Sequence, residues 1–191
     1  GAPLFLMIQN LFSNLAMGDK TQIAFWMNIG AAVCSGLTIL CLFWSITVLA
    51  KKVYLRTTNS ELSNAYIISV IGAGVVGSLA YAFTDTFWFS AVESEVYAMS
   101  SLCTAVVFWA ILKWEARADE PGGDRWLILI AYVMGLSIGV HLLNLLVIPA
   151  IALVIYFRRA KSITPKGVLK ALLLVVAVLA LVLLGVVLYL I

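Results

Sequence analysis

Charged side chains are scarce in this 191-residue chain: Asp, Glu, Lys and Arg together make up 11% of it. A soluble globular domain carries roughly 25% charged residues, so this chain has too few to cover a surface that faces water. Apolar residues make up 64%, and several apolar runs reach the ~20 residues that cross a bilayer core. The composition excludes a soluble domain and predicts an all-α, polytopic helical membrane protein.

Residues that hold metals or form disulfides are also few. The single histidine is His141, and the three cysteines are Cys34, Cys41 and Cys103. The cysteines lie inside apolar runs without the spacing of a metal site or a disulfide framework, so we expect small buried hydrophobes. The sequence has no D-x-D motif and no recognisable Ser/His/Asp or Cys/His arrangement, which leaves a metal centre and nucleophilic catalysis poorly supported. No cofactor and no nucleic-acid partner is predicted, and a need for a divalent metal stays open.

The apolar segments divide the chain into one short helix and about six spans, within a single transmembrane domain of residues 1–191. Residues 1–19 place apolar side chains at helical spacing between polar ones, which predicts an interfacial helix on the outer side. The predicted spans lie near residues 22–50, 63–83, 97–114, 126–140, 142–157 and 168–191. Since the chain begins without an initiator Met and ends inside an apolar run, we expect a fragment of a longer protein.

The stretch SVIGAGVVGSLAY, residues 69–81, contains the pattern G-x-G-x-x-G of a dinucleotide-binding fingerprint. That fingerprint needs a strand, a tight turn and a helix in water, whereas these glycines lie within an apolar span. A phosphate-binding loop there would leave backbone groups unsatisfied in lipid. We therefore predict close helix packing through small residues. The pairs expected to make it are Gly74 with Ser78, Ala73 with Gly77, and Gly135 with Gly139.

The basic residues predict the orientation of the spans, because loops rich in Lys and Arg stay on the cytoplasmic side. They form two clusters, one of Lys51, Lys52 and Arg56 and one of Arg158, Arg159, Lys161, Lys166 and Lys170. If both are cytoplasmic loops, residues 126–157 cross twice as a hairpin of short helices. We predict that this hairpin turns on the outer side at 139–144, and that Pro149 bends its second arm.

The outer face predicted in this way is acidic. It holds Asp19, Asp85, Glu93, Glu95 and His141, with Lys20 as its only Lys or Arg. An outer site that handles phosphate needs a donor, so we name His141, Lys20 and the neighbouring Asn144 as candidate substrate-binding residues. The alternative is that His141 is a structural residue whose hydrogen bonds are satisfied.

The outer connection at 81–101 combines acids with aromatic rings, and it is the candidate site for chemistry. A carboxylate near the hydrocarbon edge is costly and tends to be functional, and it is suited to take a proton from a hydroxyl. The candidates are Glu95 and Glu93 as catalytic residues, with Asp85, Trp88 and Tyr97 as substrate-binding residues. Because the two glutamates are two residues apart, on a helix at most one would face a given site. The alternative is an aromatic belt at the bilayer surface with solvated acids.

Three motifs carry a resemblance to a known family: GAPLF at the start, AVESEVYA in the outer connection, and GLSIGVHLLNL at the hairpin turn, followed by IPAI. In this order the chain resembles the bacterial membrane family known as domain of unknown function 2723. That family is similar to protein O-mannosyltransferases and belongs to the GT-C glycosyltransferase superfamily. The resemblance covers essentially the whole chain.

The resemblance implies a GT-C-like fold and a glycosyltransferase with a polyprenyl-phosphate sugar as donor. The sugar, mannose or a similar hexose, would pass to a hydroxyl of a protein or glycan on the periplasmic face of the bacterial inner membrane. The family places an acidic D-x-G-E motif before the segment matched by residues 1–4. The resemblance therefore implies that the first span and the main catalytic Asp precede Gly1, and that this chain alone is inactive.

Residue by residue, the resemblance matches Glu95 best, and Glu93 next, to the family's second outer-loop acid. It matches His141 and Asn144 to a turn near the sugar phosphate. Two other functions compete with the enzyme. A lipid or sugar transporter predicts inverted repeats and charges at mid-membrane, neither of which the sequence displays, and a non-catalytic scaffold predicts no dependence on either glutamate.

Overall fold

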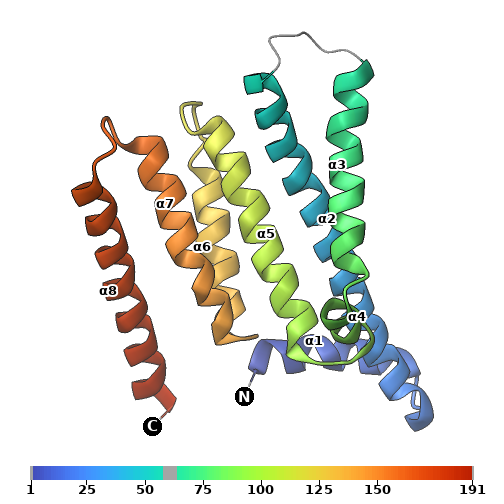
Figure 1. Ribbon diagram of the computed structural model, residues 1–191. Helices are drawn as coiled ribbons and strands as arrows, with labels where there is room; N and C mark the ends of the chain where they lie inside the picture. Colours follow the sequence, from blue (N-terminus) through green and yellow to red (C-terminus); the bar gives the residue numbers. More distant parts are fainter. Residues whose placement is uncertain (1, 58–63, 191) are drawn as a thin grey trace.

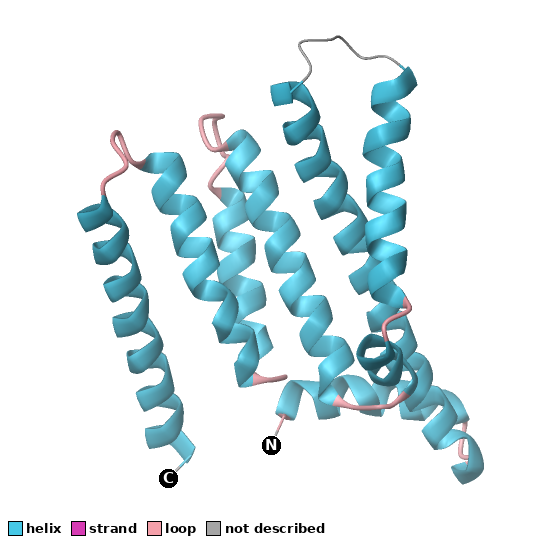
Figure 2. Ribbon diagram, viewed as in Figure 1, coloured by secondary structure: helices cyan, strands magenta, loops and turns pink. Residues whose placement is uncertain are grey.

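The computed structural model describes residues 2–57 and 64–190, which form helices and no strand (Figure 1; Figure 2). The α-helices are α1 (Pro3–Ser13), α2 (Ile23–Thr57), α3 (Asn64–Ala82), α4 (Asp85–Val92), α5 (Val96–Arg117), α6 (Arg125–Ile138), α7 (Ile148–Arg159) and α8 (Pro165–Leu190). The 3-10 helices of the described residues are η1 (Asn14–Ala16), η2 (Lys20–Gln22) and η3 (Leu142–Val147). The prediction of an all-α, multi-pass membrane protein is confirmed.

Five helical segments of the described residues are long and apolar enough to cross a membrane, where about six spans are predicted. They are Lys20–Thr57, Asn64–Ala82, Val96–Arg117, Leu142–Arg159 and Pro165–Gly185. The remaining predicted span, 126–140, corresponds to α6. Its 14 residues measure about 21 Å at ~1.5 Å per residue, less than the ~30 Å hydrocarbon core. The fourth predicted span, 126–140, is therefore an apolar helix too short to cross a full core.

Helix α2 continues past the end predicted for it. The sequence predicts a span near 22–50 followed by a loop with three basic residues, and this loop is wrong because the helix runs unbroken to Thr57. Residues 51–57 contain no Gly or Pro, so nothing in them interrupts the backbone hydrogen bonds. The length of an apolar run indicates where the chain leaves the hydrocarbon core. The helix itself continues until its backbone hydrogen bonds are interrupted. Lys51, Lys52 and Arg56 consequently lie on the last turns of α2.

The predicted turn between two short helices is confirmed. Helix α6 ends at Ile138, and the chain turns through Gly139 and Val140 into η3. Pro149, predicted to bend the second arm, lies in the first turn of α7, directly after η3. At that position the missing N–H of proline costs no helical hydrogen bond. The residues directly before α7 form the 3-10 helix η3 and not an α-helix.

The glycine-rich stretch lies within α3, which is unbroken through residues 64–82, and this excludes a nucleotide-binding loop. A Cβ placed on Gly74 would lie 2.6 Å from Thr47 Cγ2, and one on Gly77 would lie 2.8 Å from Ile46 Cδ1, both on α2. These glycines therefore let α2 and α3 approach closely, as predicted. Gly135 differs, because a Cβ there meets open space, so the predicted packing at that position is wrong.

Helix α5 is the centre of the packed interior. It contacts α2, α6 and α7, and Val107, Ala110 and Trp114 on it have no exposed surface. The same cluster includes Ile130 and Met134 of α6. The buried side chains of α5 between residues 107 and 114 make this helix the centre of the packed interior between the two ends of the bundle.

The long helices run alongside one another, so the bundle has two ends (Figure 1). At one end lie the last turns of α2, α5 and α7, with every Lys and Arg except Lys20 at or near it; we call it the basic end. At the other end lie α4, η3 and α1, and the predicted N-terminal helix α1 crosses the ends of its neighbours. This end carries Asp19, Asp85, Glu93 and Glu95, and we call it the acidic end.

Candidate functional site

A cavity of about 840 Å³ lies at the acidic end, where α3, α4 and α5 meet. Its lining consists of Tyr81, Thr84, Asp85, Thr86, Phe87, Phe89, Ser90, Glu93, Glu95, Tyr97 and Ser101. Three of these residues are carboxylates and four are aromatic. We call this space the acidic cavity.

Helix α4 forms one wall of the acidic cavity, and the sequence did not reveal it. After α3 ends, the Thr84 hydroxyl donates to the Tyr81 carbonyl at 2.8 Å, and the backbone then turns into eight helical residues. Asp85 lies in the first turn, where the helix dipole stabilises a negative charge. Phe87 is buried and its ring centroid lies 4.7 Å from that of Tyr81. This ring pair holds α4 against α3.

Glu93 and Glu95 face the same cavity, which corrects the expectation that only one would. That expectation assumed a helix. Instead Glu93 is the residue that ends α4 and Glu95 the one that precedes α5, both with extended backbone (φ −112°, ψ 136° and φ −122°, ψ 168°). The backbone turns at Ser94 between them, where the Glu95 N–H donates to the Glu93 carbonyl at 2.9 Å, and both carboxylates line the acidic cavity.

The carboxylates of the acidic cavity are accessible. Asp85, Glu93 and Glu95 are exposed. Within the described residues none of the three forms an ion pair or a side-chain hydrogen bond. Their oxygens are therefore available to the hydroxyl groups of a ligand.

A second cavity of about 590 Å³ continues from the first toward the interior of the bundle. Tyr81 and Ser101 line both cavities, so the two spaces adjoin. The second lies among α2, α3, α5 and η3 and is lined mainly by apolar side chains, among them Leu42, Ile46 and Phe108. We call it the apolar cavity.

Asn144 is the main polar group of the apolar cavity. It is 3% exposed, and its Oδ1 accepts hydrogen bonds from Ser100 Oγ at 2.6 Å and Thr104 Oγ1 at 3.1 Å. Its amide nitrogen Nδ2 is buried and has no hydrogen-bond partner. A buried N–H without an acceptor is costly, so Asn144, which lines the apolar cavity, keeps an unused donor.

His141 lies between η3 and the acidic cavity. Its Nδ1 accepts a hydrogen bond from the Leu143 backbone N–H at 3.1 Å, which begins η3. Its ring lies 5.7 Å from the ring of Tyr97, a lining residue of the acidic cavity. Since Nδ1 accepts, the neutral ring carries its proton on Nε2, and that nitrogen has no partner among the described residues.

Three of the predicted site residues line neither cavity: His141, which reaches only the Tyr97 ring, and Trp88 and Lys20. Trp88 stacks on Phe83 with ring centroids 5.9 Å apart and is 54% exposed. Lys20 is exposed in η2, at the start of α2. Neither side chain lines the acidic or the apolar cavity, so the structure gathers Asp85, Glu93, Glu95 and Tyr97 in one cavity and Asn144 in the adjoining one.

The hydroxyl groups around Asn144 were missed by sequence reasoning. Ser100 and Thr104 are four residues apart in an apolar helix, so they lie on one face of α5. That spacing indicates a pair of hydroxyls on one helix face and could have been recognised. Nothing in the sequence indicates that Asn144, 40 positions after Thr104, accepts hydrogen bonds from both hydroxyls.

Metal ligands are not grouped in the part of the chain that the structure describes. There, no set of three or more His, Cys, Asp or Glu side chains is placed to hold a metal ion. The three cysteines are free thiols, with Cys41 buried and the other two half-buried.

A comparison with protein families identifies a match. The family model described as "Protein O-mannosyl-transferase TMEM260 N-terminal domain" matches residues 1–164. No curated protein and no solved structure matches the chain. The matched range contains both cavities and every helix except α8, and the chain belongs to the family of the protein O-mannosyl-transferase TMEM260 N-terminal domain.

Proposed function

We propose that this protein is the core of a GT-C membrane glycosyltransferase, as the likeness to domain of unknown function 2723 implies. It would transfer mannose or a similar hexose from a polyprenyl phosphate to a hydroxyl of a protein or another acceptor. One observation carries the proposal: the acidic cavity presents three exposed, unpaired carboxylates among aromatic rings. Carboxylates accept hydrogen bonds from sugar and acceptor hydroxyls, and aromatic faces line small-molecule sites.

The carboxylates supply the polar half of the site. Glu95 and Glu93 would orient the attacking hydroxyl and accept its proton as the bond to the anomeric carbon forms. The family likeness adds a catalytic Asp from a segment before Gly1, and Glu95 would then act beside it. Asp85 and Tyr97 would bind the sugar, whereas Trp88 lies outside the cavity.

The apolar cavity suits the donor lipid. Its apolar lining fits a polyprenyl chain, and the free amide of Asn144 would donate to a phosphate oxygen. His141 would donate from Nε2 to the same phosphate, which leaves as the sugar is transferred. Lys20 is the one cation at this end that adds positive potential, and a divalent metal would serve the same purpose.

The charge distribution supports an outward-facing site. Basic segments stay on the cytoplasmic side of a membrane, so the basic end would face the cytoplasm and the acidic end the periplasm of a bacterial cell. The adjoining cavities would then open on the side where lipid-linked sugars are presented to exported acceptors.

Sugar transfer in membranes of the native gene product tests the proposal. The assay follows a labelled hexose from polyprenyl phosphate into acceptor, with wild type, Glu95→Gln and the matched control Glu120→Gln at equal expression. Glu120 is an exposed glutamate at the basic end, so its variant makes the same chemical change far from the site. We expect transfer by wild type and the control, and loss in Glu95→Gln.

Two outcomes contradict the proposal in different ways. If Glu95→Gln transfers as fast as wild type, the essential acid lies elsewhere and the acidic cavity is not the site. If the folded wild-type protein transfers sugar from none of the polyprenyl donors, the scaffold or transporter function replaces the enzyme.

A further inference from the structure

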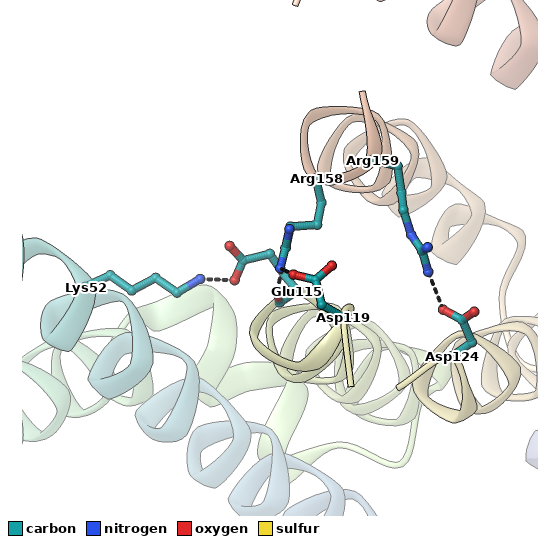
Figure 3. Close-up of polar contacts among 6 residues, drawn as sticks. All are labelled: Lys52, Glu115, Asp119, Asp124, Arg158 and Arg159. Carbon is teal, nitrogen blue, oxygen red and sulfur yellow. Dashed lines mark hydrogen bonds and ion pairs between the residues drawn. The ribbon is translucent and has the colours of Figure 1, made fainter. Parts of the chain in front are cut away.

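The basic end contains a network of ion pairs that joins three helices (Figure 3). Lys52 of α2 pairs with Glu115 of α5, and Arg158 of α7 pairs with Asp119, just after α5. Arg158 Nε also donates to the Glu115 carbonyl at 3.1 Å. These contacts hold Lys52 and Arg158 on either side of Glu115, so two cations from separate helices are fixed near each other.

A small cavity of about 290 Å³ lies between these two cations. Its lining consists of Lys52, Leu112, Glu115, Val154, Phe157 and Arg158. The polar half therefore holds two cations and one carboxylate, and the other half is apolar. Phe157 is 47% exposed, so the apolar half reaches the surface of the protein.

Both cations keep hydrogen-bond donors that the protein does not use. An ammonium group has three N–H donors and a guanidinium has five. Lys52 donates to Glu115 alone, and Arg158 donates through Nε and one Nη2 contact, within the described residues. Asp119 is 75% exposed, so water screens its hold on Arg158. The remaining donors can therefore bind an additional anion.

We propose that this cavity binds an anionic phospholipid, with its phosphate between Lys52 and Arg158 and an acyl chain along Val154 and Phe157. A basic recess between membrane helices at the cytoplasmic surface is the kind of place that holds an anionic headgroup. The apolar wall beside the two cations favours a lipid over a free anion, because a soluble phosphate leaves that wall uncovered. This site is separate from both cavities of the acidic end and does not depend on the proposed sugar transfer.

Glu115 is the group that opposes an anion in this cavity, and it provides the sharpest test. If the network is only a structural brace, removing either partner of Lys52–Glu115 has the same effect. If the cavity binds a phosphate, Lys52→Gln weakens lipid retention, whereas Glu115→Gln strengthens it because a repulsive charge disappears while both cations stay. If Lys52→Gln and Glu115→Gln change lipid retention in opposite directions, the cavity is a binding site and not a structural brace.

The experiment measures lipid bound to the full chain by native mass spectrometry after reconstitution in equal parts of phosphatidylcholine and phosphatidylglycerol. We expect wild type to retain one phosphatidylglycerol in preference to phosphatidylcholine. The double variant Lys52→Gln/Arg158→Gln is expected to retain it roughly tenfold less, since two charge contacts are lost. Lys51→Gln and Arg159→Gln are the matched controls, because neither residue lines the cavity, and both should retain the lipid.

Three results overturn the proposal. One is equal retention of the two lipids by wild type. Another is a loss of phosphatidylglycerol in Glu115→Gln as large as that in Lys52→Gln, which identifies a brace. The third is displacement of the lipid by inorganic phosphate at millimolar concentration, which shows that the apolar wall contributes nothing. Thermal unfolding of each variant is recorded alongside, so that a misfolded variant is recognised and replaced by Lys52→Met.

Discussion

The two ends of the bundle use carboxylates in opposite ways. At the basic end, Glu115, Asp119 and Asp124 each pair with a Lys or Arg of another helix. At the acidic end, Asp85, Glu93 and Glu95 line one cavity, and none of them has an ion-pair partner within the described residues. The same side-chain chemistry thus connects helices at one end and remains open to ligands at the other.

The difference follows from where cations are placed. Eleven of the 12 Lys and Arg residues lie at or near the basic end, so most carboxylates there find a partner on another helix, with the exposed Glu120 as an exception among the described residues. Lys20 is the exception, and it lies outside the acidic cavity. A membrane protein that keeps cations on one side therefore leaves acids on the other side unpaired, which suits them to chemistry.

The largest expected effect comes from neutralising one glutamate at each end. Glu95→Gln should reduce sugar transfer by at least ~100-fold, the lower range for loss of a group that handles a proton, with little change in thermal stability. Glu115→Gln should leave transfer within a few-fold of wild type and lower the unfolding temperature instead. Transfer rate and unfolding temperature are measured on the same preparations.

If Glu95→Gln and Glu115→Gln both lower the unfolding temperature and neither reduces sugar transfer, the carboxylates of the two ends do not differ in role. The control for expression is Glu120→Gln, which has no ion pair in the structure. It should match wild type in both measurements.

Next in size is a change midway between the ends, at the contact of α2 and α3. Gly74→Ala places a methyl group 2.6 Å from Thr47 Cγ2 and 2.8 Å from the Phe43 ring. Overpacking of this kind costs about 1–3 kcal/mol, so the unfolding temperature should fall. Gly72→Ala is the matched control, since a Cβ there meets open space, and better helix propensity should make it neutral or slightly stabilising.

If the contact of α2 and α3 is purely structural, Gly74→Ala lowers the unfolding temperature. It does not change the comparison between Glu95→Gln, which reduces transfer, and Glu115→Gln, which reduces stability. Equal behaviour of Gly72→Ala and Gly74→Ala in thermal unfolding would show that α2 and α3 do not pack as described.

A smaller effect is expected from Glu115→Ala. The side chains of Lys52 and Glu115 are 37% and 31% exposed, so solvent screens the pair, and exposed ion pairs contribute only ~0.2–1 kcal/mol. Chemical denaturation should show a loss within that range, and the double variant with Lys52→Ala should lose no more than the sum of the single variants. A much larger loss would mean that the pair is shielded from water by lipid.

The smallest effect concerns Asp124, whose pKa lies below its ordinary value. The Trp114 indole N–H donates to its Oδ1 at 3.1 Å and is the main cause, with the attraction of Arg159 adding to it. A carboxyl with a lowered pKa in the folded protein stabilises the fold at pH values above its ordinary pKa of about 3.9. That contribution disappears as the pH falls through the pKa that the carboxyl has in the folded protein.

Asp124→Asn should therefore lower the unfolding temperature slightly at neutral pH, and the difference from wild type should close below about pH 4. Thermal unfolding across that pH range measures it. A difference that stays constant down to the lowest pH would assign the stabilisation to the shape of the side chain and not to its charge.

Much of the helical layout was predictable because apolar length and basic clusters follow directly from the properties of a bilayer. The end of α2 was not, since hydropathy changes at Lys51 while the backbone continues to Thr57. The place of Pro149 was not predictable for a related reason: its position relative to the first turn of α7 depends on η3, which no hydropathy pattern shows.

The candidate site was predictable in composition but not in geometry. The sequence identified the acids and rings of 81–101, yet a helical assumption separated Glu93 from Glu95, which the turn between α4 and α5 brings to one cavity. The partnership of Asn144 with Ser100 and Thr104 joins distant parts of the chain. Such a contact depends on how η3 docks against α5, and no local pattern encodes it.

The difference in length between α2 and α6 has a consequence for the surrounding bilayer. Helix α2 has 35 residues and α6 has 14, so at ~1.5 Å per residue they measure about 52 and 21 Å. One face of α6 is open, with Ile128 70% and Tyr132 64% exposed. A hydrophobic helix shorter than the hydrocarbon thickness draws the leaflets together beside it. We therefore expect the lipid next to α6 to be locally thinned, and the protein to partition into the thinner regions of a laterally uneven membrane.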